Sequence, residues 1–262
     1  TLHSILGHIN TPETKIWTAE DPVEITQKGL RQVQVNRKAG LDFPTVMRSF
    51  LRADPDVIMV GEMRDKETVS IGLEASLTGH LVFSTLHTNS APESIVRLLD
   101  MGMDPFNFAD ALLGILAQRL AKRLCSKCKK PYHPSDDEVR GMLDEYCEDL
   151  RQTPAFMDDP VAAKEQILAR WRQSYADDKG RFTLYEPVGC DQCNGGYKGR
   201  LGLHELMVGS DRIKSLIQER ARVSALLSAA LDEGMRTLRQ DGIEKVFGGV
   251  TDLKQVRKVC IR

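Results

Sequence analysis

The chain has 262 residues, of which 41% are apolar and 28% are charged, and this composition indicates a globular protein rather than a disordered one. Lys and Arg number 36 against 37 Asp and Glu, so no basic excess indicates nucleic acid as the main partner. The longest apolar stretch, residues 111–117, is far shorter than the roughly 20 residues of a membrane-spanning helix, and the first residues lack the pattern of an export signal. We therefore expect a soluble protein without direct membrane insertion.

The first hundred residues alternate between predicted helices and strands. In chain order the expected elements are a helix at 2–9, strands at 15–19 and 30–35, a helix at 44–52, a strand at 57–60, a helix at 66–79, a strand at 80–88 and a helix at 91–100. Such alternation is typical of a mostly parallel sheet with helices on both faces. The sequence therefore predicts an α/β core in residues 1–106.

From residue 107 the expected character is mainly helical, and residues 107–262 form the predicted second domain. Residues 107–124 are interpreted as one long amphipathic helix with a basic end. Residues 135–180 are rich in charge and carry two apolar stripes at helical spacing, which favour core packing over a binding face. A strand is predicted at 199–208, and the residues from 211 onward have helical periodicity.

Four of the six cysteines form two Cys-x-x-Cys pairs, Cys125 with Cys128 and Cys190 with Cys193. Four thiolates are the full tetrahedral set of a structural zinc, and such pairs favour a reducing compartment over a disulfide scaffold. Free thiols or redox pairs are the alternatives. The 61 residues between Cys128 and Cys190 (129–189) exceed the ~15 to 20 usual for such sites, so we expect the intervening chain to hold a helical insertion at about 135–180.

Acidic and imidazole side chains follow three of the predicted strands. The residues concerned are Glu20 and Asp21, Glu62 and Arg64, and Thr85 and His87. Ligands bind at the carboxyl ends of the strands in open α/β sheets, so these side chains are expected to converge on one site. Each also has an ordinary interpretation, because Glu-Asp-Pro is a common turn and a lone His is usually a hydrogen-bonded structural residue.

Four segments resemble the motifs of the secretion ATPases that drive type II secretion and type IV pilus assembly. They are TAEDPVEI (18–25), RSFLRADPDVIMVGEMRDKETV (48–69), TGHLVFSTLHTNSA (78–91) and the two cysteine pairs with their flanking residues. These segments are similar, in the family's order, to the Asp box, the Walker B segment, the His box and the tetracysteine motif. The cysteine pairs resemble those of the secretion and pilus-extension branch, and they speak against the pilus-retraction branch.

The resemblance implies a RecA-like P-loop NTPase core followed by a zinc-bearing C-terminal domain. It implies that Glu62 supports Mg²⁺ and polarises the attacking water, that Glu20 is a second carboxylate near the γ-phosphate, and that His87 senses this phosphate. Which of Glu20 and Glu62 is the better base stays open. The further residues expected around the nucleotide are Asp21, Arg64, His80 and Thr85.

The phosphate-binding loop that this resemblance requires is not in the sequence. No G-x-x-x-x-G-K-[ST] pattern occurs in the 262 residues. In the family, this loop passes directly into a helix like that at 2–9, so Thr1 is expected to lie just after it. The chain is therefore expected to be a truncated core, the C-terminal part of an ATPase, and inactive alone.

The resemblance also implies cofactors, partners and a location. The intact protein is expected to use ATP with Mg²⁺, to hold structural Zn²⁺, and to form a homo-hexamer on the cytoplasmic face of the inner membrane. There it would act on an inner-membrane platform protein that assembles pilin-like subunits. Two alternatives are a DNA-translocating RecA-like ATPase, which the charge balance disfavours, and a non-catalytic, zinc-stabilised interaction module.

Overall fold

The computed structural model describes residues 1–260, which divide into two compact units. The first unit holds residues 1–89, 93–113 and 209–222, and the second holds residues 90–92, 114–208 and the described residues from 223 onward. The two units therefore interleave along the chain, whereas the sequence predicts a single boundary after residue 106. No helix among residues 1–260 has the length and apolar character needed to cross a membrane.

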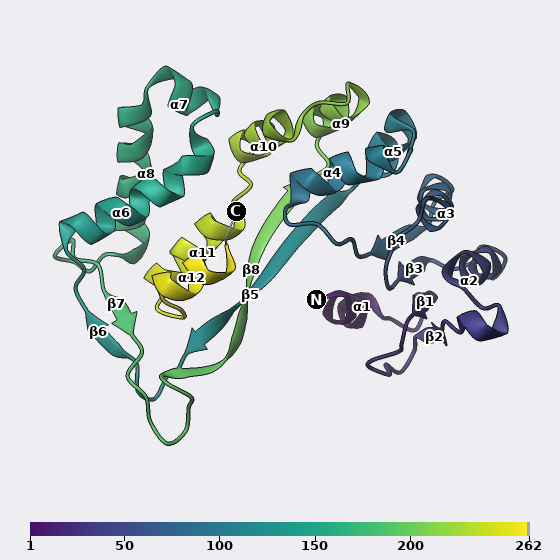
Figure 1. Ribbon diagram of the computed structural model, residues 1–262, viewed down its shortest axis with the longest axis horizontal. Coiled ribbons are helices and arrows are strands. Elements are labelled where there is room, and N and C mark those ends of the chain that lie inside the picture. Colours follow the sequence, from purple (N-terminus) through teal and green to yellow (C-terminus); the bar gives the residue numbers. More distant parts are fainter. Residues whose placement is uncertain (261–262) are drawn as a thin grey trace. The chain divides into compact units, whose positions relative to one another are not determined.

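The first unit is built on a four-stranded parallel sheet in the order β2-β1-β3-β4 (Figure 1). Its strands are β1 (Ile16–Glu20), β2 (Arg31–Gln34), β3 (Val57–Val60) and β4 (Leu81–Ser84). Its helices are α1 (Leu2–Ile9), α2 (Phe43–Phe50), α3 (Lys66–Leu77), α4 (Ala91–Asp100, whose first two residues belong to the second unit), α5 (Pro105–Ala111) and α9 (Asp211–Gln218). The predicted strand–helix order and the α/β fold class are thereby confirmed.

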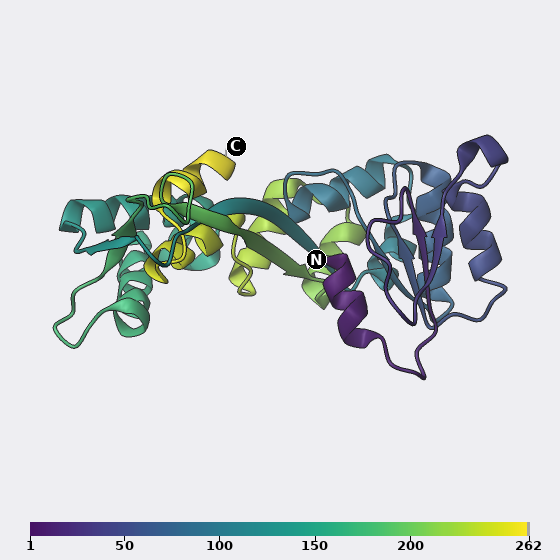
Figure 2. The same cartoon turned by 90° about the horizontal axis from the view of Figure 1, so that it is seen from below.

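Side-chain alternation along β3 divides the core of this sheet into two layers. Ile58 and Val60 pack on one face with α2 and α3, and Val57 and Met59 pack on the other with Leu6 of α1. Figure 2 shows α1 on one side of the strands and α2 on the opposite side. All four residues of β3 are buried, as expected for a central parallel strand covered by helices on both faces.

The second unit is organised around a long antiparallel ribbon of β5 (Gly114–Leu124) and β8 (Tyr197–Val208). A second, short antiparallel pair joins β6 (Lys130–Tyr132) to β7 (Leu184–Glu186). The helices of this unit are α6 (Asp136–Cys147), α7 (Pro154–Asp158), α8 (Pro160–Tyr175), α10 (Val223–Asp232), α11 (Leu238–Phe247) and α12 (Leu253–Val259).

The predicted long helix at 107–124 is wrong. Helix α5 ends at Ala111, and the rest of the segment is the strand β5. Its residues GILAQRLAKRL are good helix formers, but pairing with β8 places Ala121 opposite Leu201 and buries both Ala121 and Leu203 completely. Tertiary packing thus overrides the intrinsic helix propensity of this segment.

The predicted insertion at 135–180 does contain two long amphipathic helices, α6 and α8. Their apolar stripes meet in one core with residues of α11 and α12. Trp171 is the largest fully buried side chain of the protein's described part, and its ring lies 5.1 Å from Tyr146 and 4.7 Å from Phe247, measured between centroids. The insertion therefore packs on its own unit, as its stripes predict.

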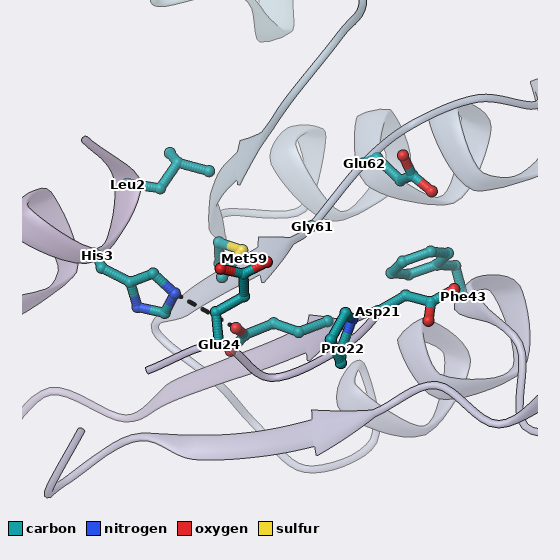
Figure 3. A pocket seen from close by; sticks show the side chains of 10 residues that line it. Leu2, His3, Asp21, Pro22, Glu24, Phe43, Met59, Gly61 and Glu62 are labelled. Atoms are coloured by element: carbon teal, nitrogen blue, oxygen red, sulfur yellow. Dashed lines mark ion pairs between the residues drawn. The ribbon is translucent and has the colours of Figure 1, made fainter. Parts of the chain in front are cut away.

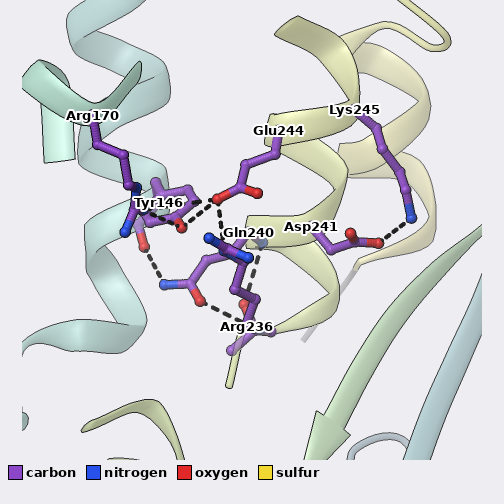
Figure 4. Close-up of polar contacts among 8 residues, drawn as sticks. Tyr146, Arg170, Arg236, Gln240, Asp241, Glu244 and Lys245 are labelled. Carbon is purple, nitrogen blue, oxygen red and sulfur yellow. Dashed lines mark hydrogen bonds and ion pairs between the residues drawn. The ribbon is translucent and has the colours of Figure 1, made fainter. Parts of the chain in front are cut away.

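A polar network joins the insertion to α11 beside this core (Figure 4). The Tyr146 hydroxyl donates to Glu244 Oε1 at 2.8 Å and accepts from Arg170 Nη2 at 2.9 Å. Glu244 also binds Arg236 at 2.7 Å, and the Gln240 side chain donates to the Tyr146 carbonyl at 2.9 Å. The Tyr146 side chain is thus satisfied at its polar end while its ring stays in the core.

Candidate functional site

The carboxyl ends of β1 and β3 lie side by side and carry the two predicted catalytic acids. Ala19 pairs with Val60 in the sheet. Glu20 is the last residue of β1, and Glu62 follows the end of the neighbouring strand β3 after one intervening residue, Gly61. A cavity of about 210 Å³ opens here (Figure 3). It is lined by Leu2, His3, Glu20, Asp21, Pro22, Glu24, Phe43, Met59, Gly61 and Glu62. The predicted convergence of Glu20, Asp21 and Glu62 is therefore present in the fold.

Glu20 is only 4% exposed, and its carboxylate is fully engaged by neighbouring side chains. Oε1 accepts hydrogen bonds from Thr18 Oγ1 at 2.6 Å and from Gln32 Nε2 at 3.0 Å. Oε2 lies 3.4 Å from Nε2 of His3, which reaches over from α1. A buried carboxylate is tolerated only with such partners, and here they also fix the direction of its oxygens.

Glu62 is held differently, by residues of its own loop and of the loop after β4. Oε2 accepts a 2.5 Å hydrogen bond from Arg64 Nε and lies 3.4 Å from His87 Nε2. Thr85 holds the backbone of the Glu62 loop: its hydroxyl donates to the Gly61 carbonyl at 2.6 Å, and its carbonyl accepts from the Met63 amide at 3.1 Å. The structure thus brings Arg64, Thr85 and His87 together around Glu62.

His80 is the one predicted site residue that the structure places elsewhere. It precedes β4 and so lies at the amino edge of the sheet, whereas Glu62 and His87 follow the carboxyl ends of their strands. Its Nδ1 atom is 2.9 Å from the Ala75 carbonyl and 3.3 Å from Thr78 Oγ1, at the end of α3. These contacts are those of a residue that fixes a helix terminus.

Sequence reasoning missed three polar residues near the acids: His3, Gln27 and Gln32. None of them belongs to the motif segments, and their partners lie up to 24 positions away in sequence. The sequence offers only a weak signal for His3, which is a polar residue near the start of a predicted helix. Its contact with Glu20 follows from the packing of α1 against the sheet, which the sequence does not show.

Four acidic residues line the cavity, namely Glu20, Asp21, Glu24 and Glu62, together with His3. Carboxylate oxygens are the protein ligands that Mg²⁺ prefers, and a carboxylate that does not itself bind the metal can orient a water molecule as nucleophile. The donor set therefore fits a magnesium-dependent reaction at a phosphate, and Glu62, at 17% side-chain exposure, is more accessible than Glu20.

The second predicted site, the tetracysteine cluster, lies entirely in the second unit. The Sγ atoms of Cys125, Cys128, Cys190 and Cys193 all lie within 4.8 Å of one another. Three of the pairs are separated by 3.6, 3.7 and 4.0 Å. Four sulfurs at a Zn–S distance of ~2.3 Å in a tetrahedron are ~3.8 Å apart, so the arrangement fits one zinc ion.

Backbone amides contact two of the four sulfurs, although burial raises the pKa of the Cys128 thiol. The Cys190 amide lies 3.3 Å from Cys193 Sγ, and the Gly189 amide lies 3.4 Å from Cys128 Sγ. Burial raises the pKa of Cys193, but hydrogen bonds from the Cys190 and Gly196 amides outweigh it and bring that pKa down to about 7. Gly196 has a φ of +88°, and a Cβ there would meet Pro187 at 2.4 Å, so only glycine fits.

The long spacing between the two cysteine pairs is accommodated by the sheet. β6 begins two residues after Cys128 and β7 ends four residues before Cys190, and these two strands pair with each other. The pairing of β6 with β7 therefore brings the two ends of the 61-residue interval together, and the insertion lies between these strands in the sequence. A spacing outside the usual range thus leaves the cluster intact.

The chain is similar in sequence to proteins of bacterial secretion and pilus assembly. The family described as "Type II/IV secretion system protein" matches residues 1–258. The type IV pilus assembly ATPase PilB of Pseudomonas aeruginosa is 42% identical over 260 residues, covering 99% of this chain and 40% of that protein. The type II secretion system protein E of Dickeya dadantii is 40% identical over 260 residues, with 99% and 45% coverage.

Solved structures agree with the fold. The pilus retraction motor PilT with bound ADP superposes with a TM-score of 0.63 at 25% identity, over 98% of this chain and 56% of that one. The ATPase DotB of Legionella pneumophila superposes with a TM-score of 0.58 at 21% identity, over 97% and 54%, and this likeness concerns the fold alone. The chain spans 26% to 45% of the length of the curated relatives it matches. Because the family model matches residues 1–258 and the pilus assembly ATPase of Pseudomonas aeruginosa is 42% identical over 260 residues, the chain belongs to the type II/IV secretion system protein family.

Proposed function

We propose that the intact protein is an ATP-hydrolysing motor of type II secretion or type IV pilus assembly, and that the cavity beside Glu20 and Glu62 is its catalytic site. The observation that carries the proposal is the junction of Glu62, Arg64 and His87 next to Glu20, at the carboxyl edge of a parallel sheet. Two relatives that align with 99% of this chain, at 42% and 40% identity, are named as ATPases of pilus assembly or secretion.

Each residue has a role that its surroundings support. Glu62 would support Mg²⁺ and polarise the attacking water, since it is the better exposed of the two acids. Glu20, held by donors from Thr18 and Gln32 and by the contact with His3, would keep a second negative charge fixed near the γ-phosphate. His87 is 72% exposed at its side chain and contacts Glu62, so it is free to turn toward a phosphate oxygen. Arg64 and Thr85 would hold the loops on which these groups stand, and Asp21 lines the same cavity.

The remaining assignments concern the longer protein. We propose that ATP with Mg²⁺ binds with a phosphate loop preceding Thr1, that zinc fills the cysteine cluster, and that the intact protein works as a homo-hexamer. Its location would be the cytoplasmic face of the inner membrane, where it would act on a platform protein. A phosphate cradle of backbone N–H groups and a lysine is needed for tight nucleotide binding, so the 262 residues alone should be inactive.

The test compares two lengths of the protein, the 262-residue chain and a longer chain that includes the preceding loop. Hydrolysis of radiolabelled ATP and equilibrium ATP binding are measured on both, with and without Mg²⁺. We expect magnesium-dependent hydrolysis by the longer chain and neither activity in the shorter one. Robust hydrolysis by the 262 residues would contradict the proposal. A longer chain that neither binds nor hydrolyses ATP would favour a non-catalytic interaction module, and a salt-sensitive DNA complex would favour a translocase.

A further inference from the structure

A closed circuit of polar contacts surrounds Glu20 and joins four parts of the first unit. From Glu20, the circuit passes to Gln32 on β2, whose Nε2 donates to Glu20 Oε1 at 3.0 Å. Gln32 Oε1 accepts from the Gln27 amide at 2.8 Å, in the loop between β1 and β2. Gln27 then contacts His3 on α1, and His3 returns to Glu20. Figure 3 shows His3 reaching from α1 toward the cavity, and the dashed line from its ring marks the ion pair with Glu20, which carries no label.

His3 is fixed in this circuit from two sides. Gln27 Nε2 donates to the His3 carbonyl at 3.0 Å, which sets the orientation of the Gln27 amide and leaves its Oε1 atom 3.5 Å from His3 Nδ1. On the other side, His3 Nε2 lies 3.4 Å from Glu20 Oε2. Both ring nitrogens therefore face acceptor oxygens, and a hydrogen carried on Nε2 would be directed at the carboxylate of Glu20.

The circuit divides the two oxygens of Glu20 between different partners. Oε1 is occupied by Thr18 and Gln32, which belong to the sheet. Oε2 has His3 as its partner, and His3 comes from α1 and also lines the cavity. His3 therefore restrains this oxygen from a separate helix.

We propose that His3 is a positioning residue for Glu20: through its Nε2 atom it fixes the direction of Oε2, and through Gln27 it ties the loop at 21–30 to α1. This inference rests on the proposed ATPase function, because the reaction that Glu20 serves is taken from it. Loss of the Nε2 donor should leave Glu20 in place on Thr18 and Gln32 but let Oε2 turn. The effect should fall on turnover more than on ATP affinity, because the catalytic geometry is disturbed while the phosphate cradle is not.

A matched set of variants isolates the Nε2 atom. Gln carries its amide nitrogen at nearly the same distance from the backbone as Nε2 of histidine, whereas Asn reaches only the Nδ1 position and Phe offers no donor. His3→Gln should therefore rescue what His3→Asn and His3→Phe lose. The same three changes at His8, an exposed histidine on the same helix, control for helix propensity and charge.

The first measurement uses the 262-residue chain and does not need catalysis. Amide hydrogen exchange is followed at Gln27 and through residues 21–30. His3→Phe and His3→Asn should exchange faster there than the parent, and His3→Gln and the His8 variants should match the parent. Equal exchange in all of them would overturn the circuit as a restraint on this loop.

The second measurement uses the longer, ATP-hydrolysing chain. His3→Phe and His3→Asn should lower kcat about tenfold, with KM for ATP within about twofold and His3→Gln within about threefold of the parent. Unchanged kcat in the Phe and Asn variants, or a Gln variant no better than Phe, would overturn the positioning role while the function stands. If the longer parent hydrolyses no ATP, the proposed function fails, and the exchange measurement alone decides whether His3 holds the loop.

Discussion

The Nε2 atom of His87 lies 3.4 Å from the Oε2 atom of Glu62, which Arg64 also binds. These residues come from the loops after β3 and β4, and Thr85 ties the two loops together through Gly61 and Met63. The His87 side chain is 72% exposed, so its ring has room to turn away from Glu62.

His87→Ala in the longer chain should slow ATP turnover by about 100-fold, the scale seen when one stabilising donor is removed from a transition state. ATP affinity should change much less, because the donors of the phosphate loop stay in place. Steady-state kinetics and equilibrium binding separate the two effects. His80→Ala is the matched control, and since His80 lies at the opposite edge of the sheet, this variant should keep parental turnover.

The cysteine cluster should hold one zinc ion per chain. Structural zinc stabilises small zinc-binding peptides by about 10 to 16 kcal/mol, so chelation should unfold at least the ribbon end and the strand pair beside the cluster. Elemental analysis of protein purified without added metal gives the stoichiometry, and far-UV circular dichroism with chelator gives the unfolding. Cys190→Ser should lose the metal, whereas Cys260→Ser, outside the cluster, should retain it. A zinc content near zero in the parent would refute this site.

The core between the insertion and α11 should depend on Trp171. Trp171→Ala should destabilise the second unit by about 3 to 5 kcal/mol in urea denaturation, because the side chain is fully buried against Tyr146 and Phe247. Trp171→Phe should cost clearly less, since the buried Nε1 atom has no hydrogen-bond partner among residues 1–260. Met157→Ala, at a residue 75% exposed, should stay within about 0.5 kcal/mol of the parent. Equal losses at the two positions would contradict the packing described.

Alkaline pH should destabilise this same region through Tyr146. Burial, followed by the charge of Glu244 and the hydrogen bond to it, raises the pKa of Tyr146 from 10.0 to about 12. The folded chain therefore keeps a proton that the unfolded chain releases above pH 10, so stability is full below pH 10 and falls as the pH rises toward 12. Urea midpoints measured between pH 9 and 12 should fall less steeply in Tyr146→Phe. Identical slopes in both proteins would show that this hydroxyl is not buried as described.

Local patterns in the sequence were sufficient for the sheet and for the groups at its carboxyl edge. The apolar run 57–60 and the acids after it predicted a buried strand with acidic groups at its carboxyl end, because both signals lie in consecutive residues. The same holds for the two cysteine pairs, whose ligand spacing is local within each pair.

Contacts between residues that are far apart in the sequence could not be predicted from local patterns. Residues 114–124 favour a helix by themselves and become a strand only because β8, some 80 positions later, pairs with them. His3 likewise gains its meaning from Glu20, Gln27 and Gln32, which are separated from it in sequence and meet it through the packing of α1 on the sheet. His80 is the opposite case: it belongs to a motif segment, yet it lies at the amino edge of the sheet and does not line the cavity.

The central claim, that Glu62 acts on the attacking water, is tested most directly by Glu62→Gln in the longer chain, with ATP binding and hydrolysis measured on the same preparation. The amide keeps the shape of the side chain and loses its charge, so turnover should disappear while ATP still binds. Glu67→Gln, at an exposed acid of α3 that pairs with Arg48, should behave as the parent. Undiminished hydrolysis by Glu62→Gln would contradict the account.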